Sequence, residues 1–100
     1  MPIQLSYSPS FKRSTKRLGR GEVAIVKSIL KALIVYYING CNLSEAQNVA
    51  PRFFYKQLRK PYYEAGVEGK IRIVIEKRGN QCMAILAGNH DQIKQFLKNV

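Results

Sequence analysis

The chain is poor in acidic residues, cysteine and histidine, and it contains no tryptophan. Its 100 residues include 17 Lys and Arg but only six Asp and Glu, which gives a formal net charge of +11. Two distant cysteines, Cys41 and Cys82, do not form the pattern of a disulfide framework. With one histidine in the chain, they do not form a zinc motif either. We therefore expect reduced thiols, no metal and no cofactor.

Long apolar runs and the common catalytic loops are also missing. The most apolar stretch, residues 23–38, is interrupted by Lys27 and Lys31 and falls short of the length that a bilayer needs. No signal peptide is visible, so we expect a cytoplasmic protein with no membrane partner. The sequence has neither a glycine-rich phosphate loop nor a serine nucleophile elbow, which excludes those two routes to catalysis.

The remaining composition is that of one folded domain with a strong basic charge. Hydrophobic residues make up 46% of the chain and charged residues 23%, as in globular proteins. We expect a single domain over residues 1–100. A charge of +11 favours an anionic partner. Nucleic acid is the first candidate, an acidic protein the second and an anionic membrane surface the third.

The N-terminal half of the chain alternates first and then shows helical spacing. Residues 3–7 predict a short strand, and Ser8 or Ser10 is placed to cap a short basic helix over residues 11–18. A longer helix is predicted from about residue 22 to residue 38, because apolar residues recur there at steps of three and four.

The middle of the chain is ambiguous, and its C-terminal part is typical of a sheet. Asn42 or Ser44 is placed to cap a short turn that reaches Ala50. For residues 52–60 the sequence is equally consistent with a helix and with an irregular loop.

Strands are predicted over residues 62–67, 71–76 and 81–87, with turns at residues 68–69 and 78–80. A last helix is predicted from about Asp91. Asn89 or Asp91 caps it, with Asn89 three residues before Gln92 as in a capping box, so the cap does not need His90. The predicted fold is α/β, of the α+β type: two N-terminal helices packed on a mainly antiparallel sheet of about four strands, with a C-terminal helix.

His90 and Arg72 are the candidate catalytic residues. Histidine is the side chain whose ordinary pKa, about 6.5, lies near working pH, and His90 falls between the last strand and the last helix. Arg72 alternates with Ile71, Ile73 and Ile75, so it lies on the open face of the sheet if the isoleucines face the helices. Each residue also has a plain structural interpretation, as part of a helix cap for His90 and as a solvated strand position for Arg72.

A basic and aromatic segment is the candidate RNA-binding surface. Basic side chains follow a phosphate backbone, and aromatic rings stack on splayed bases. The candidates are Arg52, Lys56, Arg59, Lys60, Tyr62, Tyr63 and Lys70. We expect three apolar residues of the same segment, Phe53, Phe54 and Leu58, to be core. One histidine and a few basic residues would suffice for metal-free cleavage of RNA, because the ribose 2′-OH is the nucleophile.

Several of these segments together resemble the RelE/ParE toxin superfamily of toxin–antitoxin modules. They are SFKRSTKRL near the N-terminus, Leu58-Arg59, Tyr63-Glu64, IRIVIE and ILAGNHDQIKQFL. The resemblance covers nearly the whole chain in the same order of elements. It implies a small curved sheet with the N-terminal helices on one face and messenger RNA, in the ribosomal A site, on the other.

The resemblance also implies roles and partners. Arg72 matches a phosphate-contacting catalytic arginine, and His90 matches a histidine that transfers protons in some relatives. The implied function is a ribosome-dependent messenger-RNA endonuclease that blocks translation and is inhibited by a cognate antitoxin. Two alternatives stay open: a ParE-like inhibitor of DNA gyrase and a non-catalytic basic RNA-binding module. Glu64 and Gly66 stand where some relatives have strand lysines, and Phe96 lies where several have a C-terminal tyrosine, so a lysine-based mechanism is not carried over.

Overall fold

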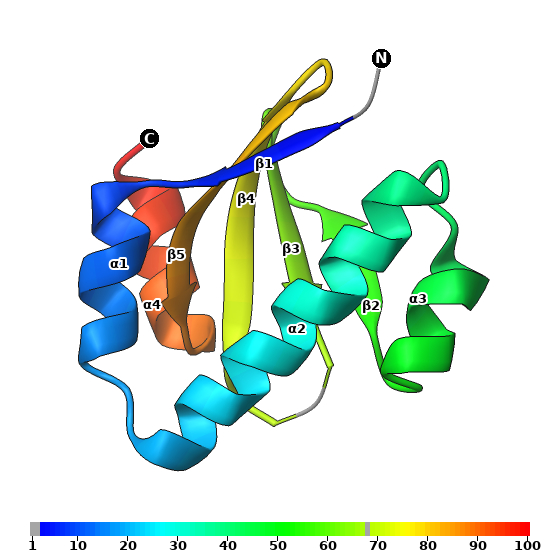
Figure 1. The fold of residues 1–100 in the computed structure, drawn as a ribbon. Coiled ribbons are helices and arrows are strands. Elements are labelled where there is room, and N and C mark those ends of the chain that lie inside the picture. The colour runs from blue at the N-terminus through cyan, green and yellow to red at the C-terminus, as the bar shows by residue number, and fades with distance from the viewer. Residues whose placement is uncertain (1–2, 68) are drawn as a thin grey trace.

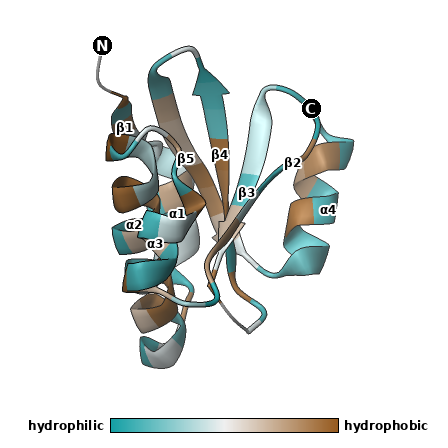
Figure 2. Cartoon of the chain, turned by 90° about the vertical axis from the view of Figure 1, so that its right-hand side faces the viewer, coloured by the Kyte–Doolittle hydropathy of each residue, from teal (hydrophilic) through white to brown (hydrophobic). Residues whose placement is uncertain are grey.

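The chain folds as three layers with a central sheet (Figure 1). The computed structural model describes residues 3–67 and 69–100. The elements in chain order are β1 (Gln4–Tyr7), α1 (Pro9–Lys16), α2 (Arg20–Ile38), α3 (Leu43–Val49), β2 (Phe54–Gln57), β3 (Tyr62–Gly66), β4 (Arg72–Arg78), β5 (Gln81–Gly88) and α4 (His90–Lys98). Helices α1, α2 and α3 lie on one side of the sheet and α4 lies on the other (Figure 2). The predicted fold class is confirmed.

The sheet has five strands in the order β1-β5-β4-β3-β2, so the predicted count of about four is too low. β1 pairs in parallel with β5, and the other neighbouring strands pair antiparallel. The additional strand is β2, in a segment for which the sequence favours a helix or a loop. Pairing with β3 and packing of Tyr55 against Tyr37 of α2 hold this short segment extended, as tertiary context often does for weak strand sequences.

Three predicted N-caps are confirmed: Ser8 for α1, Asn42 for α3 and Asn89 for α4. Both N-terminal helices begin two residues earlier than expected, α1 at Pro9 and α2 at Arg20. Proline fits the first turn of a helix because the N–H that it lacks has no partner there. The turn predicted at residues 68–69 is only partly visible, since residue 68 lies outside the described residues.

Helix α1 is fixed to β5 at an irregularity in the sheet. The register between β4 and β5 shifts, which leaves backbone groups of β5 free to bond elsewhere. The Ser10 hydroxyl donates to the carbonyl of Ile85 at 2.8 Å, and the Ala87 N–H donates to Ser14 Oγ at 3.0 Å. These bonds hold the end of β5, from which the chain continues to His90.

The main core lies between the sheet and α2. Ile29 and Leu33 of α2 and Ile73 and Ile75 of β4 belong to one buried cluster, and each is fully buried. Burial of each such side chain stabilises the fold by about 1.5–3 kcal/mol. Because neighbouring residues of a strand point to opposite faces, Arg72 lies on the face away from α2, as predicted. Within the described ranges, no helix is both long enough and apolar enough to cross a membrane.

A smaller apolar layer lies beneath α4. Val74 of β4 and Ile93 of α4 are buried but lie outside the main cluster. Tyr62 of β3 meets Phe96 of α4 edge to face, with ring centroids 5.1 Å apart. This layer holds α4 against the face of the sheet that carries Arg72, and Phe96 is half-buried in it.

Candidate active site

A cleft of about 510 Å³ opens beside α4, on the face of the sheet that carries Arg72. Parts of β2, β3 and β4, the loop before β4 and the first turn of α4 form its walls. Its lining residues are Phe54, Lys56, Glu64, Gly69, Lys70, Arg72, Asn89, His90 and Asp91. The structure therefore brings the two candidate catalytic residues into one cleft, together with Lys56 and Lys70 of the candidate RNA-binding set.

Arg72 is held in the cleft by its neighbours. Its guanidinium donates to the carbonyls of Gly69 and Ile71 and lies over the ring of Phe54, with Cζ 4.9 Å from the ring centroid. Two carbonyls and one aromatic face orient the group and leave other N–H donors of its fork available. An arginine fixed in this way suits a phosphate.

Gly66 makes room for this arrangement. A Cβ atom at Gly66 would lie 2.6 Å from Phe54 Cε1 and 2.7 Å from Arg72 Cδ, closer than real Cβ contacts come. Glycine therefore lets both side chains lie flat on the sheet at the end of β3. Phe54 was expected in the core; it is instead half-buried on the cleft side, because β2 alternates and the residue before it, Phe53, takes the core position.

His90 is the first residue of α4 and does not take part in its cap. Asn89 Oδ1 accepts from the Gln92 N–H at 2.9 Å, and Gln92 Oε1 accepts from the Asn89 N–H at 2.8 Å. This capping box leaves the exposed imidazole of His90 free at the rim of the cleft. A Cβ at Gly88 would lie 2.6 Å from Gln92 Oε1, so a glycine at this position leaves room for the Gln92 side chain that completes the cap.

Glu64 is a buried carboxylate in the cleft, and sequence reasoning missed it. It is 4% exposed, and Lys56 Nζ lies 3.2 Å from its Oε2. Glu64 pairs with Val74 across the sheet, so it shares a face with Arg72, two residues before Val74. Only the strand register reveals this, because Glu64 is far from both Arg72 and His90 in the sequence.

The charges of the cleft suit an anion that reacts by proton transfer. Cationic groups come from Lys56, Lys70 and Arg72, and the N-terminus of α4 adds the positive end of a helix dipole. Glu64 and His90 supply a carboxylate and an imidazole on the same surface. In the described part of the chain, no three His, Cys, Asp or Glu side chains lie close enough together to hold a metal ion.

The other candidate RNA-binding residues lie elsewhere. Arg59 donates to the carbonyl of Leu97 in the last turn of α4 and to that of Val100, two residues beyond the helix. Tyr63 stacks on Tyr55, on the helix side of the sheet, with centroids 5.3 Å apart.

Tyr62 packs on Phe96, Lys60 is exposed in the β2–β3 turn, and Arg52 lines a separate groove. A segment that is continuous in sequence is thus divided between two faces of the sheet and its edge.

Comparison with known proteins identifies the fold. No family model and no curated protein matches the sequence. A chain of the RelB-RelE antitoxin-toxin complex from Methanococcus jannaschii superposes with a TM-score of 0.64 at 17% identity, over 91% of this chain and 96% of that one. The chain has the RelE-type toxin fold.

Two further solved structures agree. A copper-bound mutant toxin from Helicobacter pylori matches at a TM-score of 0.65 and 18% identity, over 91% of this chain and 98% of that one. A chain of the E. coli DinJ-YafQ toxin-antitoxin complex superposes with a TM-score of 0.62 at 18% identity, over 93% of this chain and 98% of that one. The predicted resemblance is confirmed at the level of the RelE-type fold, which in this chain places His90, Arg72 and Glu64 around one cleft.

Proposed function

We propose that this chain is the toxin of a toxin–antitoxin module and cleaves messenger RNA on the ribosome, which blocks translation. One observation carries the proposal: β3, β4 and α4 bring Glu64, Arg72 and His90 to a single cationic cleft. A carboxylate, a fixed guanidinium and an imidazole are the groups that phosphodiester cleavage needs. The RelE-type fold supports the proposal, because solved toxins share it.

In the proposed reaction the RNA supplies its own nucleophile. Glu64 accepts the proton of the ribose 2′-OH, and the 2′-oxygen forms a bond to the adjacent phosphorus. Arg72 stabilises the negative charge of the phosphorane, and His90, in its protonated form, donates a proton to the departing 5′-oxygen. The products are a 2′,3′-cyclic phosphate and a 5′-hydroxyl, so atoms and protons balance without an added reagent.

Substrate binding in this proposal depends on the excess of positive charge. Lys56 and Lys70 lie in the cleft itself. On α1 and just after it, four exposed basic residues form a second cationic surface: Lys12, Arg13, Lys16 and Arg17. Together they would hold messenger and ribosomal RNA by displacing condensed counterions.

The proposed regulator is a cognate antitoxin protein. The M. jannaschii and E. coli neighbours are complexes of a toxin with an antitoxin, RelB or DinJ. A chain with net charge +11 would favour an acidic partner, by charge complementarity.

Substitutions in the cleft test the proposed function. His90→Ala, His90→Gln, Arg72→Ala and Glu64→Gln should each lower messenger-RNA cleavage, scored by primer extension on ribosomes, by about 10²–10⁴-fold. The His90 variants should melt near the wild-type temperature, because this exposed side chain takes no part in the cap of α4.

Two results would contradict the proposal. One is cleavage by the His90 and Arg72 variants at the wild-type rate. The other is toxicity accompanied by inhibition of gyrase supercoiling and intact messenger RNA, which would support the ParE-like alternative.

A further inference from the structure

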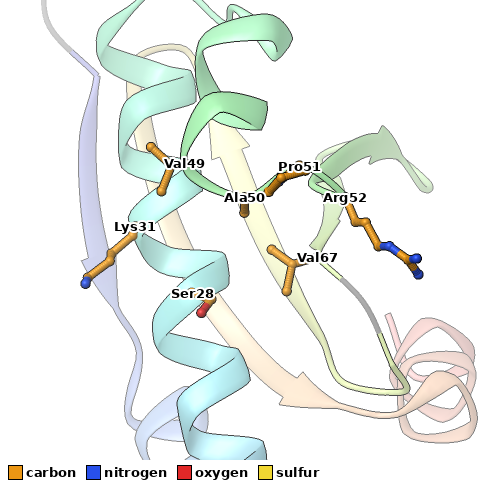
Figure 3. A pocket seen from close by; sticks show the side chains of 7 residues that line it. All are labelled: Ser28, Lys31, Val49, Ala50, Pro51, Arg52 and Val67. Carbon is orange, nitrogen blue, oxygen red and sulfur yellow. The ribbon is translucent and has the colours of Figure 1, made fainter.

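A second hollow lies on the opposite side of the molecule from the cleft. It has a volume of about 490 Å³ and is bounded by α2, by the end of α3 with the turn that follows it, and by the end of β3 (Figure 3). Its lining residues are Ser28, Lys31, Val49, Ala50, Pro51, Arg52 and Val67. We call this hollow the α2–α3 groove. Val67 directly follows Gly66, which faces the cleft, and α2 and α3 lie on the side of the sheet away from α4 (Figure 2).

The α2–α3 groove combines an apolar floor with one cationic side chain at each rim. Val49 is 47% exposed although it is a large apolar side chain, and Val67 and Ala50 lie beneath it. Lys31 extends from α2 and Arg52 from the turn after α3, and their charged ends point away from each other at the two rims of the groove (Figure 3). Within residues 3–67 and 69–100, neither cation forms an ion pair, and no acidic side chain lines the groove.

The apolar surface continues along α2 beyond the groove. Lys27, Lys31, Ile34 and Ile38 are spaced by four, three and four residues, so they share one exposed stripe of the helix. Ile34 is 44% exposed and Ile38 is 70% exposed. Exposed branched apolar side chains that lie side by side are typical of a surface that a protein partner covers.

These features fit a peptide better than a nucleic acid. Bases bind by stacking on aromatic rings, and none of the groove's lining residues is aromatic. Valine, alanine and proline instead accommodate aliphatic side chains, and a cation at each rim suits carboxylates that flank the apolar face of a peptide. We propose that the α2–α3 groove binds an acidic amphipathic peptide segment of a partner protein, which places aliphatic side chains against Val49 and Val67 and carboxylates near Lys31 and Arg52.

This inference does not depend on the reaction proposed for the cleft. The antitoxin would be one protein able to supply such a segment. A segment bound here would contact the sheet from the side away from His90, so it would leave the cleft open to RNA. Binding at the groove and cleavage in the cleft are therefore separable by measurement.

Fluorescence anisotropy with three labelled synthetic peptides tests the proposal. The first peptide repeats leucine and glutamate at helical spacing, the second has the same composition in scrambled order, and the third carries lysine in place of glutamate. The first should bind saturably at physiological salt, at least about tenfold more tightly than the scrambled peptide. The lysine peptide should not bind. Amide shifts on binding should centre on Ser28, Val49 and Val67.

Matched charge reversals separate the groove from general attraction to a basic protein. The double variant Lys31→Glu with Arg52→Glu should weaken binding of the first peptide by about tenfold or more. Lys94→Glu with Lys98→Glu makes the same change of charge on the exposed face of α4 and should alter binding by less than about twofold. Val49→Ala, which keeps the charge, should weaken binding as well.

The proposal fails if the two double variants lose affinity equally, if the scrambled peptide binds as tightly as the patterned one, or if no saturable binding occurs. Thermal unfolding of each variant verifies that the fold is intact. If the variant Lys31→Glu with Arg52→Glu does not fold, the test rests on the affinity of Val49→Ala and on which amides shift when the wild type binds the peptide.

Discussion

Replacement of Gly66 by alanine should disable the cleft while leaving the fold in place. The added Cβ would lie 2.6 Å and 2.8 Å from Phe54 Cε1 and Cζ, and 2.7 Å from Arg72 Cδ. Neither side chain can keep its position, because real Cβ contacts do not come this close. The aromatic ring on which the Arg72 guanidinium rests must therefore move, together with the arginine itself.

The size of the effect follows from these contacts. Overpacking of this kind costs about 1–3 kcal/mol of folding stability. Each kcal/mol lowers the melting temperature of a domain of this size by about 4–8 °C. A displaced Arg72 would lose its contact with the phosphorane, and loss of one such contact lowers the rate by about 10²–10³-fold. The loss of activity should thus be much larger than the loss of folded protein at assay temperature.

The assay measures messenger-RNA cleavage on ribosomes beside thermal unfolding. Gly21→Ala in α2 is the matched control, because a Cβ there meets nothing within 4 Å. It should keep full cleavage and melt at or above the wild-type temperature, since alanine favours a helix. If Gly66→Ala cleaves RNA at the wild-type rate, the position of Arg72 against Phe54 does not matter for the reaction, and our account of the cleft is wrong.

Three further predictions concern other parts of the molecule. Arg59→Ala should speed amide hydrogen exchange in α4, because it removes the donor to the carbonyl of Leu97 in the last turn of that helix and to Val100 just beyond it. Lys98→Ala should not, and equal exchange in both variants would contradict this role. Burial raises the pKa of Tyr37 above its ordinary value of 10.0, as does its 2.8 Å hydrogen bond to Tyr55. The folded state therefore binds the Tyr37 proton more tightly than the unfolded state does. The resulting contribution to the free energy of unfolding is fully present below pH 10 and is lost as the pH rises further. Urea unfolding between about pH 9 and 11 should show a shallower fall for Tyr37→Phe than for the wild type, and identical slopes would refute the effect. RNA binding should weaken by orders of magnitude between about 50 and 200 mM salt, and a flat response would exclude a phosphate-tracking surface.

The sequence predicted the elements whose patterns are strong. Alternation of Ile71, Ile73 and Ile75 predicted both the strand and the face on which Arg72 lies, and the structure confirms both. Asn89 at three residues before Gln92 predicted the capping box of α4. From this cap the position of His90, free at the start of the helix, followed directly.

The parts that the sequence did not predict depend on long-range packing. β2 has only four residues, and its extended form comes from β3 and from α2. Glu64 joins the cleft only through the register of β3 against β4, which no local pattern encodes. Tyr62 and Tyr63 are neighbours in a basic and aromatic segment and are both candidates for RNA binding from sequence, yet strand alternation places them on opposite faces of the sheet.

The central claim is that the cleft drives attack of the RNA's own 2′-OH on the adjacent phosphorus. The most direct test compares a messenger RNA with the same RNA carrying a single 2′-deoxyribose at the mapped cleavage position, followed by mass spectrometry of the new ends. We predict a 2′,3′-cyclic phosphate and a 5′-hydroxyl from the first RNA and no cleavage at that position in the second. Equal cleavage of both RNAs, or ends that carry a 3′-hydroxyl and a 5′-phosphate, would contradict the account.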